Sequence, residues 1–308
     1  MATPIVLDCD PGHDDAIALL LALASPELEL LGVTTTYGNQ TVEKTTANAL
    51  RVLELAGRTE VPVARGAAEP LARPLAVAAH VHGESGLDGP TLPPPSAEPA
   101  GSPAVDWLAE TIGASAVPVT LVPTGPLTNI ARYLEKHGSA GIARIVLMGG
   151  AIAEGNMTPA AEFNVWADPE AAQIVFDAPL DVTMIGLDVT HKAVTGPDVQ
   201  RRLREAGSIG VFVAELIDFF TVYHRQTYGW DGAPIHDAVA VAHLLRPGLV
   251  ETKLRNVEVE RVSELCRGRT VVDLWRRTRN EPNADVGVDI DADGFLELLC
   301  ERIESLDS

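Results

Sequence analysis

The chain changes from strand to helix at Asp8-Cys-Asp-Pro-Gly-His-Asp-Asp15. Before this stretch, residues 4–7 form a short apolar run typical of a buried strand, and after it residues 16–24 have helical apolar spacing that ends before Pro26. A strand that passes into a helix through a glycine-containing turn is typical of a parallel α/β sheet. The stretch therefore predicts that the chain begins with a strand and a helix of such a sheet.

Short apolar runs and amphipathic helices continue to alternate along the chain. Strands are expected at 28–36, 61–64, 117–122, 143–148 and 182–187, and helices at 42–56, 127–136 and 169–176. We therefore predict an α/β fold with an open, mostly parallel sheet, a Rossmann-like core and helices on both faces. Because the sequence shows no internal repeat or linker, residues 1–308 are expected to form a single domain.

Two parts of the chain depart from this alternation. Residues 80–103 contain six prolines and several glycines, which predicts a long irregular loop. Residues 199–228 and 236–245 are expected to be helical, and 257–259, 270–275 and 286–290 to be strand-like. A last helix is expected to have Asp293 as its cap and to run to about residue 303.

The composition is strongly acidic. Lys and Arg number 23 and Asp and Glu 43, a formal net charge of −20 over 308 residues. This charge repels phosphate backbones and anionic lipids and so argues against nucleic-acid and membrane partners. The apolar runs are shorter than the roughly 18–20 residues of a membrane helix, and no signal-peptide pattern is seen. Three widely spaced cysteines favour a reducing compartment, so a cytoplasmic protein is expected.

The opening motif places four carboxylates, Asp8, Asp10, Asp14 and Asp15, within eight residues. Like charges packed at the end of a strand are unfavourable unless a positive charge neutralises them. A helix dipole supplies only about half a charge, so a hard cation such as Ca²⁺ or Mg²⁺ is the better explanation. The alternative is that Asp14 and Asp15 only cap the helix and the others lie in a solvated turn.

The other predicted strand ends carry carbonyls, amides and acids, with no Lys or Arg among them. They are Tyr37-Gly-Asn39, Pro123 to Asn129, Met148 to Gly150 and Leu187 to His191, and Glu162-Phe-Asn164 and His236-Asp237 add further polar groups. Phosphate recognition needs Lys, clustered Arg or a glycine-rich loop. These groups instead predict a metal-assisted site for a neutral polyol or sugar.

These polar motifs, and the order in which they follow one another along the chain, resemble those of the inosine–uridine preferring nucleoside hydrolases. The first motif, continued to Ala18, is similar to the N-terminal signature of that family. The remaining similar blocks are Thr36 to Asn39, His82-Gly83, Thr124 to Asn129, Met148 to Gly150, Gly155-Asn156, Ala161 to Asn164, Ala167 to Glu170 and His236-Asp237. The resemblance implies Ca²⁺-dependent hydrolysis of the N-glycosidic bond of purine or pyrimidine ribonucleosides, a nucleoside salvage reaction that yields ribose and free base.

The resemblance also implies a role for individual residues. Ca²⁺ would be bound by the carboxylates of Asp10, Asp15 and Asp237 and the backbone carbonyl of Thr124, with Asp10 also the base that deprotonates the attacking water. Ribose contacts are implied for Asp14, Asn39 and Asn164 at the 2′- and 3′-hydroxyls, for Asn156 and Glu162 at the 5′-hydroxyl, and for Met148 along the pocket.

On the side of the base, His236 is the candidate acid because imidazole titrates near neutral pH. Tyr228 is expected to stack near the base, with His82 from the Pro-rich loop beside it. The family forms homodimers or homotetramers, so a homo-oligomer is expected.

Two other functions fit parts of the sequence. A haloacid-dehalogenase-like phosphatase also begins with a strand and Asp-x-Asp, but Asp10 is followed by Pro11, and no lysine occurs between Lys44 and Lys136. A non-catalytic riboside-binding protein would keep the fold without the chemistry. All of the residues assigned to chemistry are present, which favours the enzyme.

Overall fold

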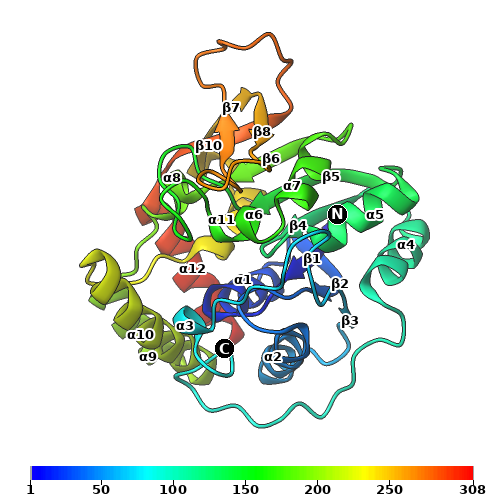
Figure 1. Ribbon diagram of the computed structural model, residues 1–308. Coiled ribbons are helices and arrows are strands. Elements are labelled where there is room, and N and C mark those ends of the chain that lie inside the picture. Colours follow the sequence, from blue (N-terminus) through cyan, green and yellow to red (C-terminus); the bar gives the residue numbers. More distant parts are fainter. Residues whose placement is uncertain (1, 308) are drawn as a thin grey trace.

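The computed structural model describes residues 2–307 and is built around an eight-stranded sheet (Figure 1). Its strands, in spatial order, are β3 (Val63–Arg65), β2 (Leu28–Thr35), β1 (Thr3–Cys9), β4 (Val119–Pro123), β5 (Ile142–Met148), β6 (Val182–Ile185), β10 (Ala284–Ile290) and β7 (Val250–Arg255). Neighbouring strands are parallel except β7 and β10, which are antiparallel. The predicted open, mostly parallel sheet is confirmed.

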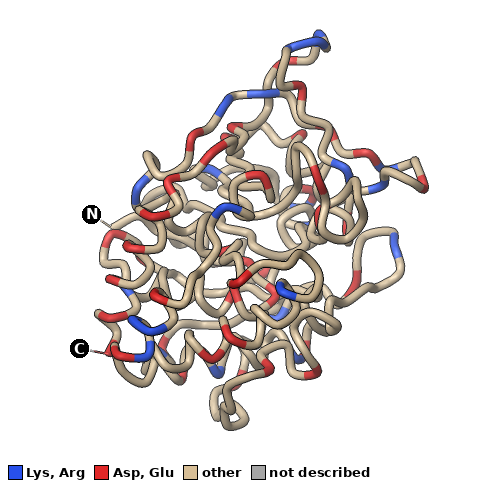
Figure 2. The backbone as a smooth tube through the Cα atoms, turned by 90° about the vertical axis from the view of Figure 1, so that its left-hand side faces the viewer, with Lys and Arg blue, Asp and Glu red and all other residues tan. Residues whose placement is uncertain are grey.

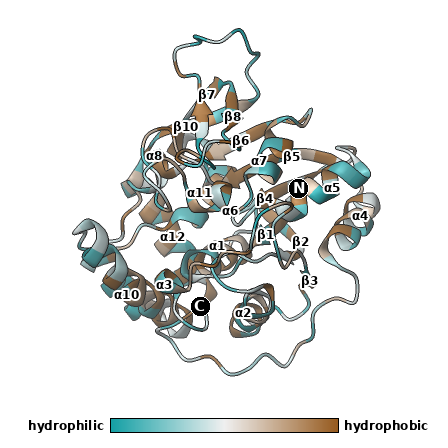
Figure 3. Ribbon diagram, viewed as in Figure 1, coloured by the Kyte–Doolittle hydropathy of each residue, from teal (hydrophilic) through white to brown (hydrophobic). Residues whose placement is uncertain are grey.

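Helices cover both faces of this sheet, as predicted (Figure 1). The first face carries α1 (His13–Leu23), α2 (Val42–Leu55), α10 (Ser208–Tyr228), α11 (His236–Leu245) and α12 (Ala292–Leu306). The second face carries α4 (Ala104–Ala114), α5 (Thr128–His137) and α7 (Pro169–Phe176). Two separate apolar cores result, one on each side of the sheet, and the strands between them are apolar along most of their length (Figure 3).

The side chains of strand β1 contribute to both cores. Ile5, Leu7 and Cys9 pack into the first core, whereas Val6 packs into the second. Because successive side chains of a strand point to opposite faces, a strand that lies between two layers must be apolar at every position. This explains the continuous apolar run that precedes the first motif.

The order of the strands fixes where ligands can bind. The chain moves outward from β1 to β2 and β3, then returns to the other side of β1 to form β4 and β5. The connections that follow the adjacent strands β1 and β4 leave in opposite directions, which opens a crevice at the carboxyl ends of these two strands. The carboxylate motif begins in β1 and ends in the first turn of α1, at this point.

Several predicted boundaries differ from the structure. Strand β6 ends at Ile185, because Gly186 caps a short helix, α8 (Leu187–Thr190). The last helix, α12, is capped by Asp291, whose carboxylate accepts a hydrogen bond from the Gly294 amide at 3.0 Å; the predicted cap, Asp293, lies in its first turn.

The Pro-rich segment is partly regular. It begins with the short helix α3 (Ala79–His82), is irregular from residue 83 to 103, and leads into α4, which the sequence analysis did not predict. Strand β7 was also not predicted. Around 199–228 the expected helix is divided into α9 (Pro197–Ala206) and α10, and the tail contains a small second sheet of β8 (Val257–Val259) and β9 (Thr270–Val272).

Acidic residues are distributed along the chain and are not confined to one face (Figure 2). Lys and Arg gather visibly at the projecting loop at the top of the view. Among residues 2–307, no helix combines the length and the apolar character needed to cross a bilayer.

Candidate active site

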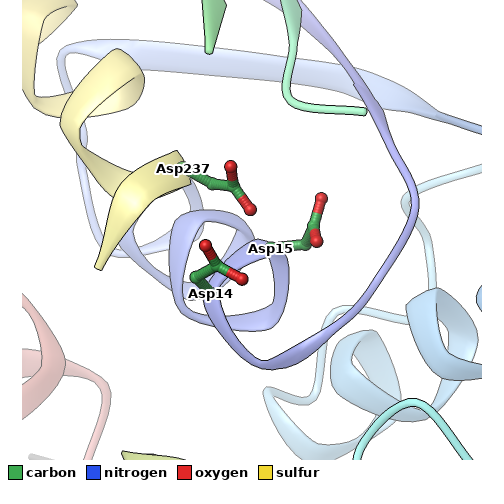
Figure 4. A group of neighbouring side chains, drawn as sticks. All are labelled: Asp14, Asp15 and Asp237. Atoms are coloured by element: carbon green, nitrogen blue, oxygen red, sulfur yellow. The ribbon is translucent and has the colours of Figure 1, made fainter. Parts of the chain in front are cut away.

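Three carboxylates from two helices point toward one another at the crevice (Figure 4). Asp14 and Asp15 lie in the first turn of α1, and Asp237 lies in the first turn of α11. One oxygen from each of the three lies within 4.8 Å of the others, and all three side chains are buried. Residues more than 200 positions apart therefore form one cluster of negative charge, because α1 and α11 pack side by side.

Asp15 connects the ends of three strands. Its carboxylate accepts hydrogen bonds from the Gly12 amide at 3.1 Å and the Asp10 amide at 3.3 Å, which shape the turn between β1 and α1. It also accepts from the Thr124 hydroxyl, after β4, and from the Asn39 side chain, after β2, both at 2.8 Å. These contacts hold an ionisable oxygen cluster in a fixed position.

Asp10 lies below the same crevice, where the backbone of two loops, at Gly38 and Gly125, closely approaches its carboxylate. Its Oδ2 accepts a hydrogen bond from the Asn39 amide at 2.6 Å, whereas Oδ1 is buried and has no partner among the described residues. A Cβ atom at Gly38 would lie 2.0 Å from this carboxylate, and one at Gly125 would lie 2.4 Å from it. Only glycine allows the two loops to approach Asp10 this closely.

Asp8, the first carboxylate of the motif, has a structural role. Its Oδ1 accepts hydrogen bonds from the Thr34 hydroxyl at 2.5 Å and the Asn129 side chain at 2.8 Å. Burial raises the pKa of Asp8 to about 7. Its contacts tie β1 to β2 and α5, so it supports the crevice and is not a member of the three-carboxylate cluster.

Burial and mutual repulsion raise the pKa values of the other carboxylates. Burial, and then the charge of Asp15, raises the pKa of Asp14 to about 8 and that of Asp10 well above its usual range. Burial raises the pKa of Asp15, and burial followed by the charge of Asp14 raises that of Asp237. The cluster therefore retains protons at neutral pH unless a cation replaces them. An oxygen-only donor set with an unpartnered buried oxygen fits a hard divalent cation such as Ca²⁺.

Asp14 and Asp237 also line a pocket whose empty space, including the part that is open to solvent, is about 680 Å³. Its wall has a polar part of acids and amides and an aromatic part of histidine, tyrosine and phenylalanine rings, and no Lys or Arg of residues 2–307 lines it. Such a wall suits a ligand that has both hydroxyl groups and a flat ring.

Most residues that the sequence analysis assigned to the site lie in the cavity wall. They are Asp14, Asn39, His82, Thr124, Met148, Asn156, Glu162, Asn164, Tyr228, His236 and Asp237. Asp10 and Asp15 do not line the cavity. Both lie directly behind it, because each is hydrogen-bonded to Asn39 in its wall.

The polar part of the wall is held by backbone contacts. Glu162 caps the short helix α6 (Phe163–Ala167) and accepts hydrogen bonds from the amides of Asn164, Val165 and Gly150 at 2.7, 3.1 and 2.8 Å. The Asn164 side chain donates to the carbonyl of Thr124 at 2.7 Å, which connects α6 to the end of β4. Burial raises the pKa of Glu162.

Burial disfavours the charged form of four histidines at or next to the aromatic part of the wall. Burial lowers the pKa of His236 and of His82 well below the usual range, and it lowers those of His13 and His224 to about 4. His236 is placed by Thr190, whose hydroxyl oxygen lies 2.7 Å from its Nδ1.

Sequence reasoning missed several rings of the wall, among them Phe220 and His224. Both lie on α10, whose apolar pattern is fully explained by packing against the core. A signal was nevertheless present, because Phe220, His224 and Tyr228 recur at intervals of four and so share one face of the helix. The rings of His224 and Tyr228 are stacked 5.7 Å apart.

A family model described as inosine-uridine preferring nucleoside hydrolase matches residues 5–297. The chain belongs to this family. The resemblance and the α/β fold are thereby confirmed, and the protein is a nucleoside hydrolase, an enzyme that cleaves N-glycosyl bonds.

Relatives of this nucleoside hydrolase match over almost their whole length. It is 54% identical over 308 residues to a protein of Salmonella typhimurium named pyrimidine-specific ribonucleoside hydrolase RihA, with 99% of each chain covered. Among solved structures, it matches a purine-preferring ribonucleoside hydrolase from Gardnerella vaginalis with a TM-score of 0.93 at 35% identity, covering 99% of both chains. A structure titled plant nucleoside hydrolase matches with a TM-score of 0.90 at 32% identity, covering 98% of this chain and 99% of that one.

The raised pKa values predict that the metal-free nucleoside hydrolase loses stability as pH rises from about 4 to 8. Asp14 ionises near pH 3.8 when its environment is unperturbed, as in the unfolded chain, but keeps its proton up to about pH 8 in the folded protein. The folded state therefore binds more protons in this window, and each pH unit lowers stability by up to about 1.4 kcal/mol per group. Thermal unfolding in a chelator between pH 5 and 8 measures the slope.

Asp14→Asn removes one of these groups and should reduce the fall in unfolding temperature across this range. Asp198→Asn is the matched control, because its side chain is 87% exposed, and it should keep the wild-type slope. Identical slopes for all three proteins would contradict the account.

Proposed function

We propose that this nucleoside hydrolase acts on pyrimidine ribonucleosides, releasing ribose and the free base with the help of a bound Ca²⁺. The observation that carries this proposal is the meeting of the Asp14, Asp15 and Asp237 oxygens beside a cavity with an aromatic wall. The choice of pyrimidines is supported by the name of the 54% identical Salmonella relative, because the relative named purine-preferring is only 35% identical.

Asp10, Asp15 and Asp237 would hold Ca²⁺ through carboxylate oxygens, and Thr124 through its carbonyl. That carbonyl already accepts a hydrogen bond from Asn164, but a carbonyl oxygen has a second lone pair for a cation. When bound, Ca²⁺ supplies positive charge that attracts ribose hydroxyls and lowers the pKa of a water molecule. The protein supplies the remaining steps through its own side chains.

Asp10 is proposed to accept the proton of the attacking water. Asn39 holds Oδ2 with its amide, which leaves the unpartnered Oδ1 available to accept. A general base must have a free lone pair within reach of the proton that it removes.

Asp14, Asn39 and Asn164 are proposed to bind the 2′- and 3′-hydroxyls, and Asn156 and Glu162 the 5′-hydroxyl, with Met148 along the ribose. All of these side chains line the cavity. Cleavage of the glycosidic bond places positive charge on the ribose, so the nearby carboxylates stabilise the transition state more than the bound substrate.

His236 is proposed to assist the departing base as a hydrogen-bond donor. Burial lowers the pKa of this imidazole well below its usual range, so the ring acts through its Nε2–H and not as an imidazolium. Among the described residues, the Thr190 hydroxyl has no acceptor other than His236 Nδ1, so Thr190 donates and the imidazole proton is on Nε2. The base leaves with negative charge, which a donor in the cavity wall stabilises. Tyr228 and His82 complete the proposed base side.

We further propose that the protein acts in the cytoplasm as a homodimer or homotetramer. Cys9, Cys266 and Cys300 are all free, which suits a reducing compartment. The proposed assembly rests on the family resemblance.

The proposed substrate class is tested by incubating the protein with uridine, cytidine or inosine and measuring released reducing sugar. The kcat/KM for uridine should exceed that for inosine by at least about tenfold, the effect of roughly 1.4 kcal/mol, and a chelator should abolish activity. Asp10→Asn should lose about 10²-fold or more in kcat, whereas Asp198→Asn should keep wild-type activity. A preference for inosine would contradict the pyrimidine assignment, and full activity in chelator would contradict the metal.

The role of His236 is tested by changing the leaving group. For uridine, His236→Ala should cost about 10²–10³-fold in kcat, the usual contribution of one hydrogen-bond donor to developing negative charge. For the riboside of p-nitrophenol, which leaves readily as an anion, the cost should be less than tenfold. Similar losses on both substrates would show that His236 only orients Asp237.

A further inference from the structure

His13 belongs to the first motif but has no part in the chemistry proposed above. Its side chain is fully buried, and its ring lies nearly parallel to those of Phe219 and Phe220, with centroids 5.1 and 5.3 Å away. Its two ring nitrogens contact two different groups, the carbonyl of Asp88 and the ring of His82. This ring therefore connects a turn of the Pro-rich segment to a residue of the cavity wall.

The contact with Asp88 fixes the proton on the His13 ring. His13 Nε2 lies 2.8 Å from the Asp88 carbonyl oxygen, and a carbonyl can only accept, so Nε2 carries the hydrogen. The turn cannot easily move away, because the Asp88 carboxylate accepts hydrogen bonds from the amides of Glu84 and Ser85, both at 3.0 Å. In the neutral ring, Nδ1 is then an acceptor.

The second contact, between the rings of His13 and His82, bears on which nitrogen of His82 carries a hydrogen. The Nδ1 atoms of His13 and His82 lie 3.0 Å apart. A neutral His13 ring with its hydrogen on Nε2 can only accept at this contact, and His82 Nδ1 would then be the donor. The backbone amide of His13 also points at His82 Nδ1, from 3.3 Å. The two contacts compete. If His82 Nδ1 accepted from the amide, two lone pairs would face each other at 3.0 Å, whereas a hydrogen on His82 Nδ1 leaves the more distant amide without this acceptor; the shorter contact between the rings favours the second arrangement.

We propose that His13 is a positioning residue that holds His82 with its proton on Nδ1 and its Nε2 as a hydrogen-bond acceptor facing the substrate. His82 lines the cavity, and its Nε2 has no partner among residues 2–307. An acceptor at this position recognises an N–H group of a base, such as the ring N–H of uracil or the amino group of cytosine. The proposal rests on the proposed function insofar as it places a base beside His82.

The tautomer can be measured without any turnover. Long-range ¹H–¹⁵N correlation of the histidine rings distinguishes a protonated from an unprotonated nitrogen, and loss of signals in His82→Gln assigns His82. In the wild-type protein, His82 should show Nδ1 protonated and Nε2 bare. His82 protonated on Nε2 would overturn the proposal, whereas failure to hydrolyse uridine would overturn the proposed function and leave this result intact.

Two substitutions at His13 distinguish an effect on the His82 tautomer from an effect on the packing of the His13 ring. His13→Phe keeps the ring between Phe219 and Phe220 but removes the acceptor, and His13→Asn offers an oxygen close to the position of Nδ1. His13→Phe should shift the proton of His82 to Nε2 and raise the KM for uridine about tenfold, the effect of one hydrogen bond. His13→Asn should restore most of both.

Free ribose has no base and cannot contact His82 through one. Its inhibition constant should therefore change less than about twofold in either variant, as expected for a substitution away from the ligand. His137→Phe, an exposed histidine on α5 beside Tyr133, is the control for an added phenyl ring and should behave as wild type. An unchanged His82 tautomer in His13→Phe would overturn the proposal. An equal rise in the KM for uridine and in the inhibition constant of ribose would also overturn it, because it would indicate a purely structural role of His13. If His13→Phe does not fold, the wild-type tautomer and His13→Asn still decide.

Discussion

The structure depends on the cost of burying several carboxylates side by side. Asp14, Asp15 and Asp237 meet within 4.8 Å, and Asp10 lies behind them with one oxygen that has no partner among residues 2–307. Burial and repulsion favour the protonated forms, so the arrangement is stable only with bound protons or a bound cation. The glycines at 38 and 125 and the hydrogen bonds from Asn39 and Thr124 hold the oxygens in place despite this cost.

The same constraint limits which ligands the crevice accepts. A cavity with acids in its wall, and with no Lys or Arg among the described residues that line it, repels phosphate groups and favours neutral hydroxyl groups. The aromatic rings of the rest of the wall suit a flat base. A nucleoside without a phosphate has both of these features, which agrees with membership in the nucleoside hydrolase family.

Much of the fold and of the site could be predicted from local pattern. Strands buried on both faces are continuous apolar runs, and oxygen-rich motifs at their carboxyl ends meet at one edge of the sheet, so nearly all assigned residues lie in or behind one cavity. The helix α4 and strand β7 were not predicted, because one follows a Pro-rich loop and the other is a largely exposed strand paired antiparallel to β10. Phe220 and His224 were missed because core packing already explains the apolar pattern of α10, although they share one helix face with Tyr228. The contacts of His13 come from tertiary packing that no spacing within the first motif encodes.

The most direct test of this account is calorimetric titration of the metal-free protein with Ca²⁺ in buffers of different ionisation enthalpy. If the buried carboxylates exchange protons for a cation, Ca²⁺ should bind at one site per chain and release protons, with more released at pH 6 than at pH 8. Asp237→Asn should lose most of this binding, whereas Asp198→Asn should keep it. Wild-type protein that binds no Ca²⁺, or binds it with no release of protons, would contradict the central claim.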